Sequence, residues 1–202
     1  MHITVFGANG GTGKQVVEQA LAAGHRVRAV VRDPKTLDLE HEDLEIVRGD
    51  VLDPSTIDVA GEAVVSCIGA RTRKAGSIAS RGTANILEAM KREGVKRVVV
   101  ISAAPLGEAE GIFQRVAFRI LWSLLRDVYD DLRRMESVLM VSDAEWTILR
   151  PPRLTDGPLT AKYRTAIDGN VGSVITRAAL AREMLRALEA PKTVRRTVGI
   201  GQ

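Results

Sequence analysis

The sequence predicts an α/β protein: a doubly wound parallel sheet in three layers, formed by a single domain over residues 1–202. Two observations indicate this fold. Short runs rich in β-branched residues, each bounded by Gly, Pro or Asp, alternate along the chain with segments of helical periodicity. The runs are apolar throughout, as strands buried on both faces are, and parallel neighbours need crossover connections, which the helices supply.

The predicted elements follow in a regular order. We expect strands at 2–6, 25–32, 44–50, 63–69, 96–103 and 145–151. Helical spacing of apolar residues predicts helices at 12–23, 54–60, 77–93, 127–141 and 177–189. The chain contains no repeat, low-complexity tract or linker, which agrees with one domain.

Composition limits the class of protein. Hydrophobic residues make up 45% of the chain and charged residues 27%, which is ordinary for a soluble globular domain. No apolar run reaches the roughly 18 residues that a transmembrane segment needs, and the N-terminus lacks the pattern of a signal peptide. We therefore expect a cytoplasmic protein without a transmembrane segment.

Charge and metal-binding residue types argue against two kinds of site. The net charge is +4, but the basic residues are scattered, and the small clusters at 71–74 and 194–196 contain no interleaved aromatic residue. We expect no nucleic-acid partner. The three histidines are not spaced as zinc ligands, and the single cysteine, Cys67, lies in an apolar run, so we expect no metal site and a buried thiol.

A glycine-rich turn follows the first expected strand. In FGANGGTG, Gly7 permits a tight exit from the strand, Gly10 lets backbone approach a pyrophosphate, and Gly13 lets the next helix pack closely. The backbone N–H groups of Gly10, Gly11, Thr12 and Gly13 stand at the positive end of that helix and would face phosphates. Strand, turn, helix and second strand in register favour a dinucleotide site over a structural turn, and a Rossmann-type fold.

Charged residues follow the next strands at the same expected edge of the sheet. Arg32 ends the second strand, where an arginine can accommodate the 2′-phosphate of NADP, but Asp33 could bind the ribose of NAD. The spacing leaves both open, and we favour NADP(H) over NAD(H). Asp50 could meet the adenine or serve as a turn residue, and Arg71 could bind a phosphate or be a solvated loop arginine.

Motifs distributed over nearly the whole chain resemble one family. They are FGANGGTG, VVRDP, GDVLD, IGAR, RGTANILEAMKREGVKRVVVIS and WTILRPPRLTDGPLT. The chain is similar to the atypical short-chain dehydrogenase/reductase group, in its NAD(P)H-binding, NmrA-like branch, and most of all to the biliverdin IXβ reductase/flavin reductase type. The resemblance implies a pyrophosphate site at Asn9, Gly10, Gly11 and Thr12, an adenine site at Asp50 and Val51, ribose and phosphate contacts at Gly69, Ala70 and Arg71, and a nicotinamide border at Ser102, Pro151, Pro152 and Arg153.

The chain departs from this family at the residues that would move protons. Short-chain dehydrogenases commonly use a Tyr-x-x-x-Lys pair, and here Tyr129 is followed by Arg133, whose charge is permanent. Tyr129 is a candidate proton donor; the alternative is a helix residue whose hydroxyl reaches water.

The resemblance to the flavin reductase type shows further changes. Its serine after the fifth strand corresponds to Ala103, with Ser102 one position earlier, and Leu132 and Arg153 stand in place of two histidines. Ser102, Tyr129 and Arg153 are thus the candidate catalytic residues. Hydride transfer to a planar acceptor needs little beyond stacking on the nicotinamide, so we expect a flavin or quinone as small-molecule substrate.

One segment indicates a second surface. Four of the seven aromatic residues, Phe113, Phe118, Trp122 and Tyr129, lie close together, and the chain around them is apolar on more than one helix face. Plain core, a cover over the substrate, and a homo-oligomer, protein-partner or membrane-surface contact through 112–125 are all open. An NAD(P)-binding, redox-sensing regulator without turnover is the alternative function, whereas a sugar-nucleotide epimerase is disfavoured because only about 50 residues follow the sixth strand.

Overall fold

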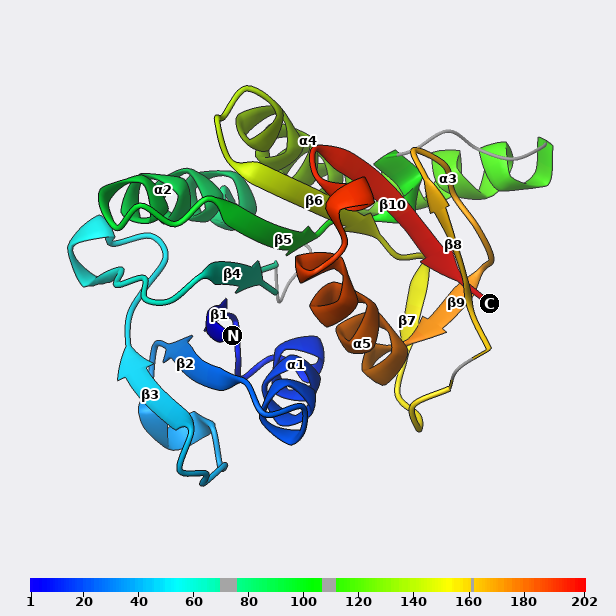
Figure 1. Ribbon diagram of the computed structural model, residues 1–202. Helices are drawn as coiled ribbons and strands as arrows, with labels where there is room; N and C mark the ends of the chain where they lie inside the picture. Colours follow the sequence, from blue (N-terminus) through cyan, green and yellow to red (C-terminus); the bar gives the residue numbers. More distant parts are fainter. Residues whose placement is uncertain (70–75, 107–111, 161) are drawn as a thin grey trace.

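The computed structural model describes residues 1–69, 76–106, 112–160 and 162–202, so the expected contacts of Ala70 and Arg71 lie outside the described residues. Within these ranges the chain forms an eight-stranded sheet in the order β3-β2-β1-β4-β5-β6-β10-β8 (Figure 1). The strands of the chain are β1 (His2–Phe6), β2 (Arg26–Val31), β3 (Leu44–Arg48), β4 (Ala63–Ser66), β5 (Arg97–Ile101), β6 (Glu145–Arg150), β7 (Arg153–Thr155), β8 (Arg164–Ile167), β9 (Val174–Thr176) and β10 (Arg196–Gly201).

The strand order confirms the doubly wound prediction. All neighbours in the sheet are parallel except β8, which runs antiparallel to β10. The order reverses between β1 and β4, and Phe6 at the end of β1 pairs with Val30 on one side and with Ser66 on the other. The carboxyl ends of these strands therefore share one edge, at the point where α/β proteins bind ligands.

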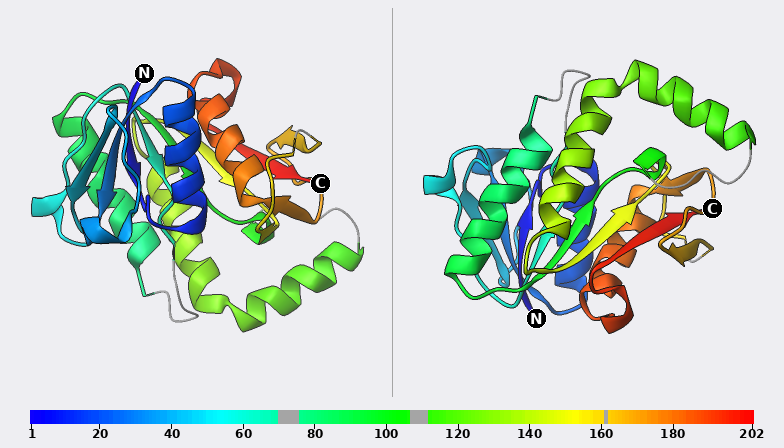
Figure 2. Two further views of the ribbon diagram at one scale, coloured as in Figure 1. Left: turned by 90° about the horizontal axis from the view of Figure 1, so that it is seen from below. Right: turned by 90° about the horizontal axis from the view of Figure 1, so that it is seen from above.

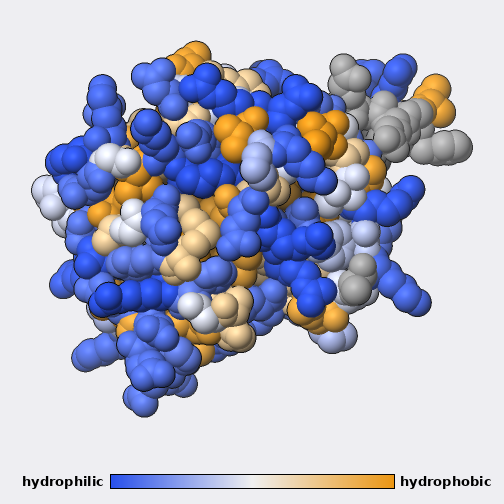
Figure 3. Space-filling view, in the orientation of Figure 1, coloured by the Kyte–Doolittle hydropathy of each residue, from blue (hydrophilic) through white to orange (hydrophobic). Residues whose placement is uncertain are grey.

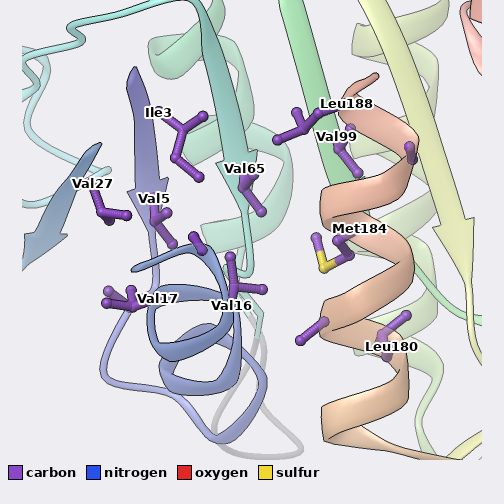
Figure 4. Packing of buried hydrophobic residues seen from close by; sticks show 14 of the residues in the cluster. Ile3, Val5, Val16, Val17, Val27, Val65, Val99, Leu180, Met184 and Leu188 are labelled. Carbon is purple, nitrogen blue, oxygen red and sulfur yellow. The ribbon is translucent and has the colours of Figure 1, made fainter. Parts of the chain in front are cut away.

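Helices cover both faces of the sheet, as the sequence pattern predicts (Figure 2). The helices are α1 (Gly11–Ala22), α2 (Ile78–Arg92), α3 (Ile112–Leu124), α4 (Arg126–Met140) and α5 (Arg177–Leu188). The apolar residues of α1 and α5 join one hydrophobic cluster, and those of α2 and α4 join another on the opposite face. In Figure 4, Val16 and Val17 of α1 and Met184 of α5 lie against the strands. These two cores hold the strand ends at the switch point in place.

Two predictions of secondary structure are wrong. The helix expected at 54–60 is only a 3-10 turn, Pro54–Thr56, because the next residues follow a period of two: Ile57 and Val59 are buried and Asp58 between them is exposed. Four strands, β7 to β10, also escaped prediction. β7 and β9 have three residues each, too few for a pattern, and β10 contains Gly199. A Cβ on Gly199 would lie 2.0 Å from Gly169 O. Close backbone packing therefore requires glycine at position 199, although glycine has a low strand propensity.

Helix α3 extends away from the sheet, and its C-terminal end meets α4 (Figure 2). Near that end Trp122 stacks on Tyr129 of α4, with ring centroids 5.2 Å apart, and the Arg133 guanidinium lies 4.6 Å from the Trp122 ring. Ile112, Val116 and Leu124 of α3 are 71%, 52% and 57% exposed, so these residues are not core. On the face seen in Figure 3, by contrast, the surface is mostly hydrophilic with scattered apolar residues.

No helix formed by the described ranges combines the length and apolar character that a membrane crossing requires.

Candidate functional site

A cavity of about 680 Å³ opens at the carboxyl ends of the strands beside the switch point. This volume lies within the usual range for small-molecule and cofactor sites. Most of the residues predicted to bind a cofactor gather here: Gly7, Asn9, Gly10, Gly11, Thr12, Gly13, Arg32, Asp50, Val51 and Gly69 all line the cavity. Residues that are far apart in the sequence therefore meet at one place.

The glycine turn is folded tightly between β1 and α1. Gly7 has a φ of 74°, which favours glycine, and its carbonyl accepts a 3.0 Å hydrogen bond from Gly10 N. A Cβ on Gly13 would lie 2.1 Å from Gly7 O, so Gly13 is required for helix and turn to pack together. Gly10 is the N-cap of α1 and has no side chain to cap it, and the first turn contains no acid. The positive end of α1 thus faces the cavity.

The adjacent residues Arg32 and Asp33 have different surroundings in the structure, a difference that the spacing in the sequence did not reveal. Arg32 is exposed and lines the cavity. The Asp33 carboxylate instead accepts a 3.1 Å hydrogen bond from Lys35 N and caps the 3-10 helix η1 (Pro34–Thr36). Asn9 Nδ2 donates to Thr36 Oγ1 at 2.8 Å, which ties this loop to the glycine turn. Arg32 is therefore the charged residue of the described loop after β2 that lines the cavity.

Asp50 forms part of the cavity wall after β3, and its contact with an adenine stays a prediction. Asp50 Oδ1 accepts a 3.0 Å hydrogen bond from Leu52 N, so Asp50 is a turn residue and lines the cavity as well. Asn85 of α2 donates to Val51 O at 2.9 Å. A Cβ on Gly82 would lie 2.9 Å from the side chains of both Val51 and Ile68, so α2 packs tightly behind this wall.

The N-terminus of α2 borders the cavity through Ser77 and Ile78 and is capped from another helix. Asp131 of α4 is 1% exposed, and its carboxylate accepts hydrogen bonds from Ala79 N at 2.8 Å and Ser80 N at 3.3 Å. A carboxylate at this position satisfies the free amides and complements the helix dipole. Asp131 thereby fixes the end of α2 against the cavity, although it does not face the ligand space itself.

The residues expected around the nicotinamide lie beside the cavity. Ser102, Pro151, Pro152 and Arg153 follow β5 and β6, but among the described residues it is their neighbours Ile101 and Leu154 that line the cavity. Ser102 is buried, its N donates to Leu149 O at 2.7 Å, and its hydroxyl has no hydrogen-bond partner within the described ranges. Arg153 is exposed at the start of β7. Their catalytic roles remain predictions.

Tyr129 of α4 belongs to the hydrophobic cluster that α2 and α4 share, stacks on Trp122, and is not among the described residues that line the cavity. Burial raises its pKa above the usual value, so the phenol stays protonated at neutral pH. Its role as proton donor is a prediction without support from its position. The alternative role, a helix residue whose hydroxyl reaches water, also stays a prediction.

Arg177 and Cys67 are among the cavity residues that were not predicted as site residues. Arg177 begins α5, and its Nη1 lies 2.7 Å from Asp156 Oδ1. The available signal was an arginine in the first turn of a predicted helix, where the helix dipole disfavours a cation. Cys67 was predicted only as buried; it lines the cavity, and burial raises the pKa of its thiol to about 12, so it stays protonated. Elsewhere, no three His, Cys, Asp or Glu side chains gather as a metal site in the described part of the chain.

The family described as NAD(P)H-binding matches residues 7–191. The chain belongs to this NAD(P)H-binding family. The match confirms the resemblance to atypical short-chain dehydrogenases/reductases and agrees with the position of the glycine turn.

Solved structures share the fold of this NAD(P)H-binding protein. A short-chain dehydrogenase/reductase from Veillonella parvula in complex with NADP has a TM-score of 0.79 at 22% identity, covering 100% of this chain and 94% of that one. A proposed NADH-flavin reductase from Streptococcus pneumoniae has a TM-score of 0.78 at 20% identity, covering 99% and 98%.

Curated relatives are longer proteins. A chloroplastic protein of Arabidopsis thaliana is 32% identical over 171 residues, covering 78% of this chain and 61% of the relative. A photosystem II assembly factor of Synechocystis is 33% identical over 109 residues, covering 50% and 33%. The chain thus spans less than two thirds of the length of these relatives.

Proposed function

We propose that the protein binds NADP(H) in the cavity and transfers hydride from NADPH to a planar acceptor, a flavin or a quinone. The observation that carries the proposal is the convergence of the glycine turn, Arg32 and Asp50 on one cavity at the switch point of the sheet. Family membership supports a nicotinamide dinucleotide as the ligand.

The residues present fit an NADP-type dinucleotide. The uncapped amides at the start of α1 suit the pyrophosphate, and Arg32 suits a 2′-phosphate through paired, charge-assisted hydrogen bonds. Asp33 could have bound the ribose of NAD, but its carboxylate accepts a hydrogen bond from Lys35 N at the start of η1. We therefore favour NADP(H) over NAD(H).

The cavity is poor in groups that exchange protons near neutral pH, which favours a planar acceptor. Its ionisable lining residues, among those described, are Arg32, Arg177, Asp50 and Cys67. Arginines keep their protons, and the thiol stays protonated because burial raises its pKa to about 12. The bound dinucleotide supplies the hydride. A flavin or quinone needs only to be held against it, with protons taken from water.

A turnover assay tests this function. NADPH should lose absorbance in the presence of FMN or a quinone, and at matched concentrations these acceptors should outpace simple ketones and aldehydes. Fast reduction of a ketone that is lost in Tyr129→Phe would contradict the proposal, since it would indicate the usual dehydrogenase mechanism.

A second candidate function is a redox-sensing regulator that binds the dinucleotide and a protein partner without turnover. Two observations favour it: relatives include photosystem II assembly factors, and Ile112, Val116 and Leu124 expose apolar surface on α3, the segment expected to make contacts through 112–125. The same assay separates the two functions. NADPH binding by calorimetry with no turnover on any flavin or quinone would support the regulator.

A further inference from the structure

Arg177 reaches the phosphate end of the cavity from a distant part of the chain. Its side chain lies across Gly11: a Cβ built on Gly11 would be 2.8 Å from Arg177 Cδ and 3.0 Å from Nε. Arg177 lines the cavity together with Gly10 and Thr12. The absence of a side chain at position 11 therefore makes room for an arginine, which stands beside the uncapped end of α1.

A cation at this position is electrostatically unfavourable without an anion. Arg177 is the first residue of α5, where the helix dipole is positive, and α1 presents its own positive end to the same cavity. Neither helix has an acidic residue in its first turn. The counter-charge of Arg177 is Asp156, whose side chain is 92% exposed, and ion pairs this open to water contribute little. The arrangement suits a bound anion.

We infer that Arg177 holds the pyrophosphate of the dinucleotide, a role that rests on the proposed function. The guanidinium carries five N–H donors in a planar fork, more than its bond from Nη1 to Asp156 uses. Asp156 orients the fork, and the other donors meet phosphate oxygens beside the amides of α1. Arg177 is thus a binding residue that does not distinguish NADP from NAD.

In this inference the two cavity arginines, Arg32 and Arg177, bind different phosphate groups of the dinucleotide. Arg32 follows β2 and meets the 2′-phosphate, which only NADP carries, whereas Arg177 meets the pyrophosphate, which NADP and NAD share. Adenosine 2′-phosphate carries the first group and lacks the second. These three ligands separate the two roles.

The test is calorimetric titration of the parent, Arg177→Ala and Arg32→Ala with NADPH, NADH and adenosine 2′-phosphate. Arg177→Ala should weaken NADPH and NADH by the same factor, about tenfold, because a charge-assisted hydrogen bond is lost, and should leave adenosine 2′-phosphate unchanged. Arg32→Ala should weaken NADPH and adenosine 2′-phosphate and leave NADH unchanged.

Two variants serve as controls. Arg186→Ala removes the same charge from an exposed position on the same helix and should change none of the three dissociation constants. Arg177→Lys keeps the charge and the aliphatic stem over Gly11 but loses the fork, and should recover part of the affinity. It also replaces Arg177→Ala as the test if the alanine variant does not fold.

The outcomes distinguish this inference from the proposed function. If the parent binds NADPH and Arg177→Ala either loses all three ligands equally or binds both dinucleotides as the parent does, the inference is wrong and the proposed function stands. If the parent binds neither dinucleotide, the proposed function is wrong, and the inference about Arg177, which rests on it, is wrong as well.

Discussion

Gly10 and Gly13 belong to the same turn but meet different surroundings. Gly10 has ordinary extended backbone, and the nearest atom to a Cβ built on it is Gly7 O at 3.2 Å. Gly13 is enclosed by backbone, with Gly7 O at 2.1 Å and Ala8 Cα at 2.9 Å from a built Cβ. One glycine therefore keeps space for a ligand, and the other keeps space for the chain itself.

This difference predicts opposite effects of two substitutions. Gly10→Val should lower the melting temperature without ligand less than Gly13→Ala does and should abolish NADPH binding, because the side chain fills the space that the phosphate needs. Gly13→Ala should lower the free energy of unfolding by about 1 to 3 kcal/mol, since backbone atoms cannot move aside. Thermal denaturation and calorimetry measure both. NADPH binding by Gly10→Val as tight as that of the parent would contradict the phosphate role.

At the scale of elements, α2 depends on α4 for the end that borders the cavity. The Asp131 carboxylate caps α2 at Ala79 and Ser80 and is nearly inaccessible to water. The neighbouring Asp130 belongs to the same helix, but its side chain is 37% exposed and its partner, Arg126, is 3.8 Å away. The two adjacent carboxylates thus differ in burial and in role: Asp131 caps α2, whereas Asp130 forms an exposed ion pair within α4.

We predict that Asp131→Ala lowers the free energy of unfolding by roughly 2 to 4 kcal/mol, because it leaves buried helix amides without an acceptor. Asp130→Ala should change it by less than about 0.5 kcal/mol, as exposed ion pairs usually do. Urea denaturation gives both values, and hydrogen exchange at Ala79 and Ser80 should quicken only in the first variant. Equal destabilisation by the two variants would show that the cap contributes nothing.

The same scale explains what the sequence could predict. β1, the glycine turn and α1 carry local signals: a buried run, glycines at fixed spacing and helical periodicity, so these elements were predicted from the residues alone, and the turn lines the cavity. The roles of Arg177 and Asp131 depend on tertiary contacts, with Gly11 and with the end of α2, that no local pattern encodes. Family spacing suggested chemistry at Tyr129, which stays a prediction, whereas the packing of that ring against Trp122 in the core is a tertiary contact that spacing does not encode.

At the scale of the whole molecule, the cavity lies where the two halves of the sheet meet. Its walls come from β1 to β3 on one side of the switch point and from β4 and β5 on the other, with the ends of α1, α2 and α5 around them. A ligand that contacts all these walls binds only when both halves are folded and joined. Binding should therefore stabilise the fold as a unit.

This coupling predicts different stabilisation by the two dinucleotides. NADPH at about 100 times its dissociation constant should add roughly 2.7 kcal/mol to the free energy of unfolding. For a chain of 202 residues that corresponds to a rise in melting temperature of about 5 to 10 °C. NADH at the same concentration should give a smaller rise, because Arg32 has no 2′-phosphate to pair with.

Arg32→Ala provides the matched comparison for this prediction. Removing the guanidinium should reduce the rise with NADPH to that with NADH, and should leave the rise with NADH unchanged, since only the 2′-phosphate contact is lost. Melting curves of parent and variant with each dinucleotide give the four values. Equal rises in the parent would remove the preference for NADP(H), and a larger rise with NADH would assign the site to NAD. The cavity would then still bind a dinucleotide through the glycine turn, but Arg32 would have no part in choosing it.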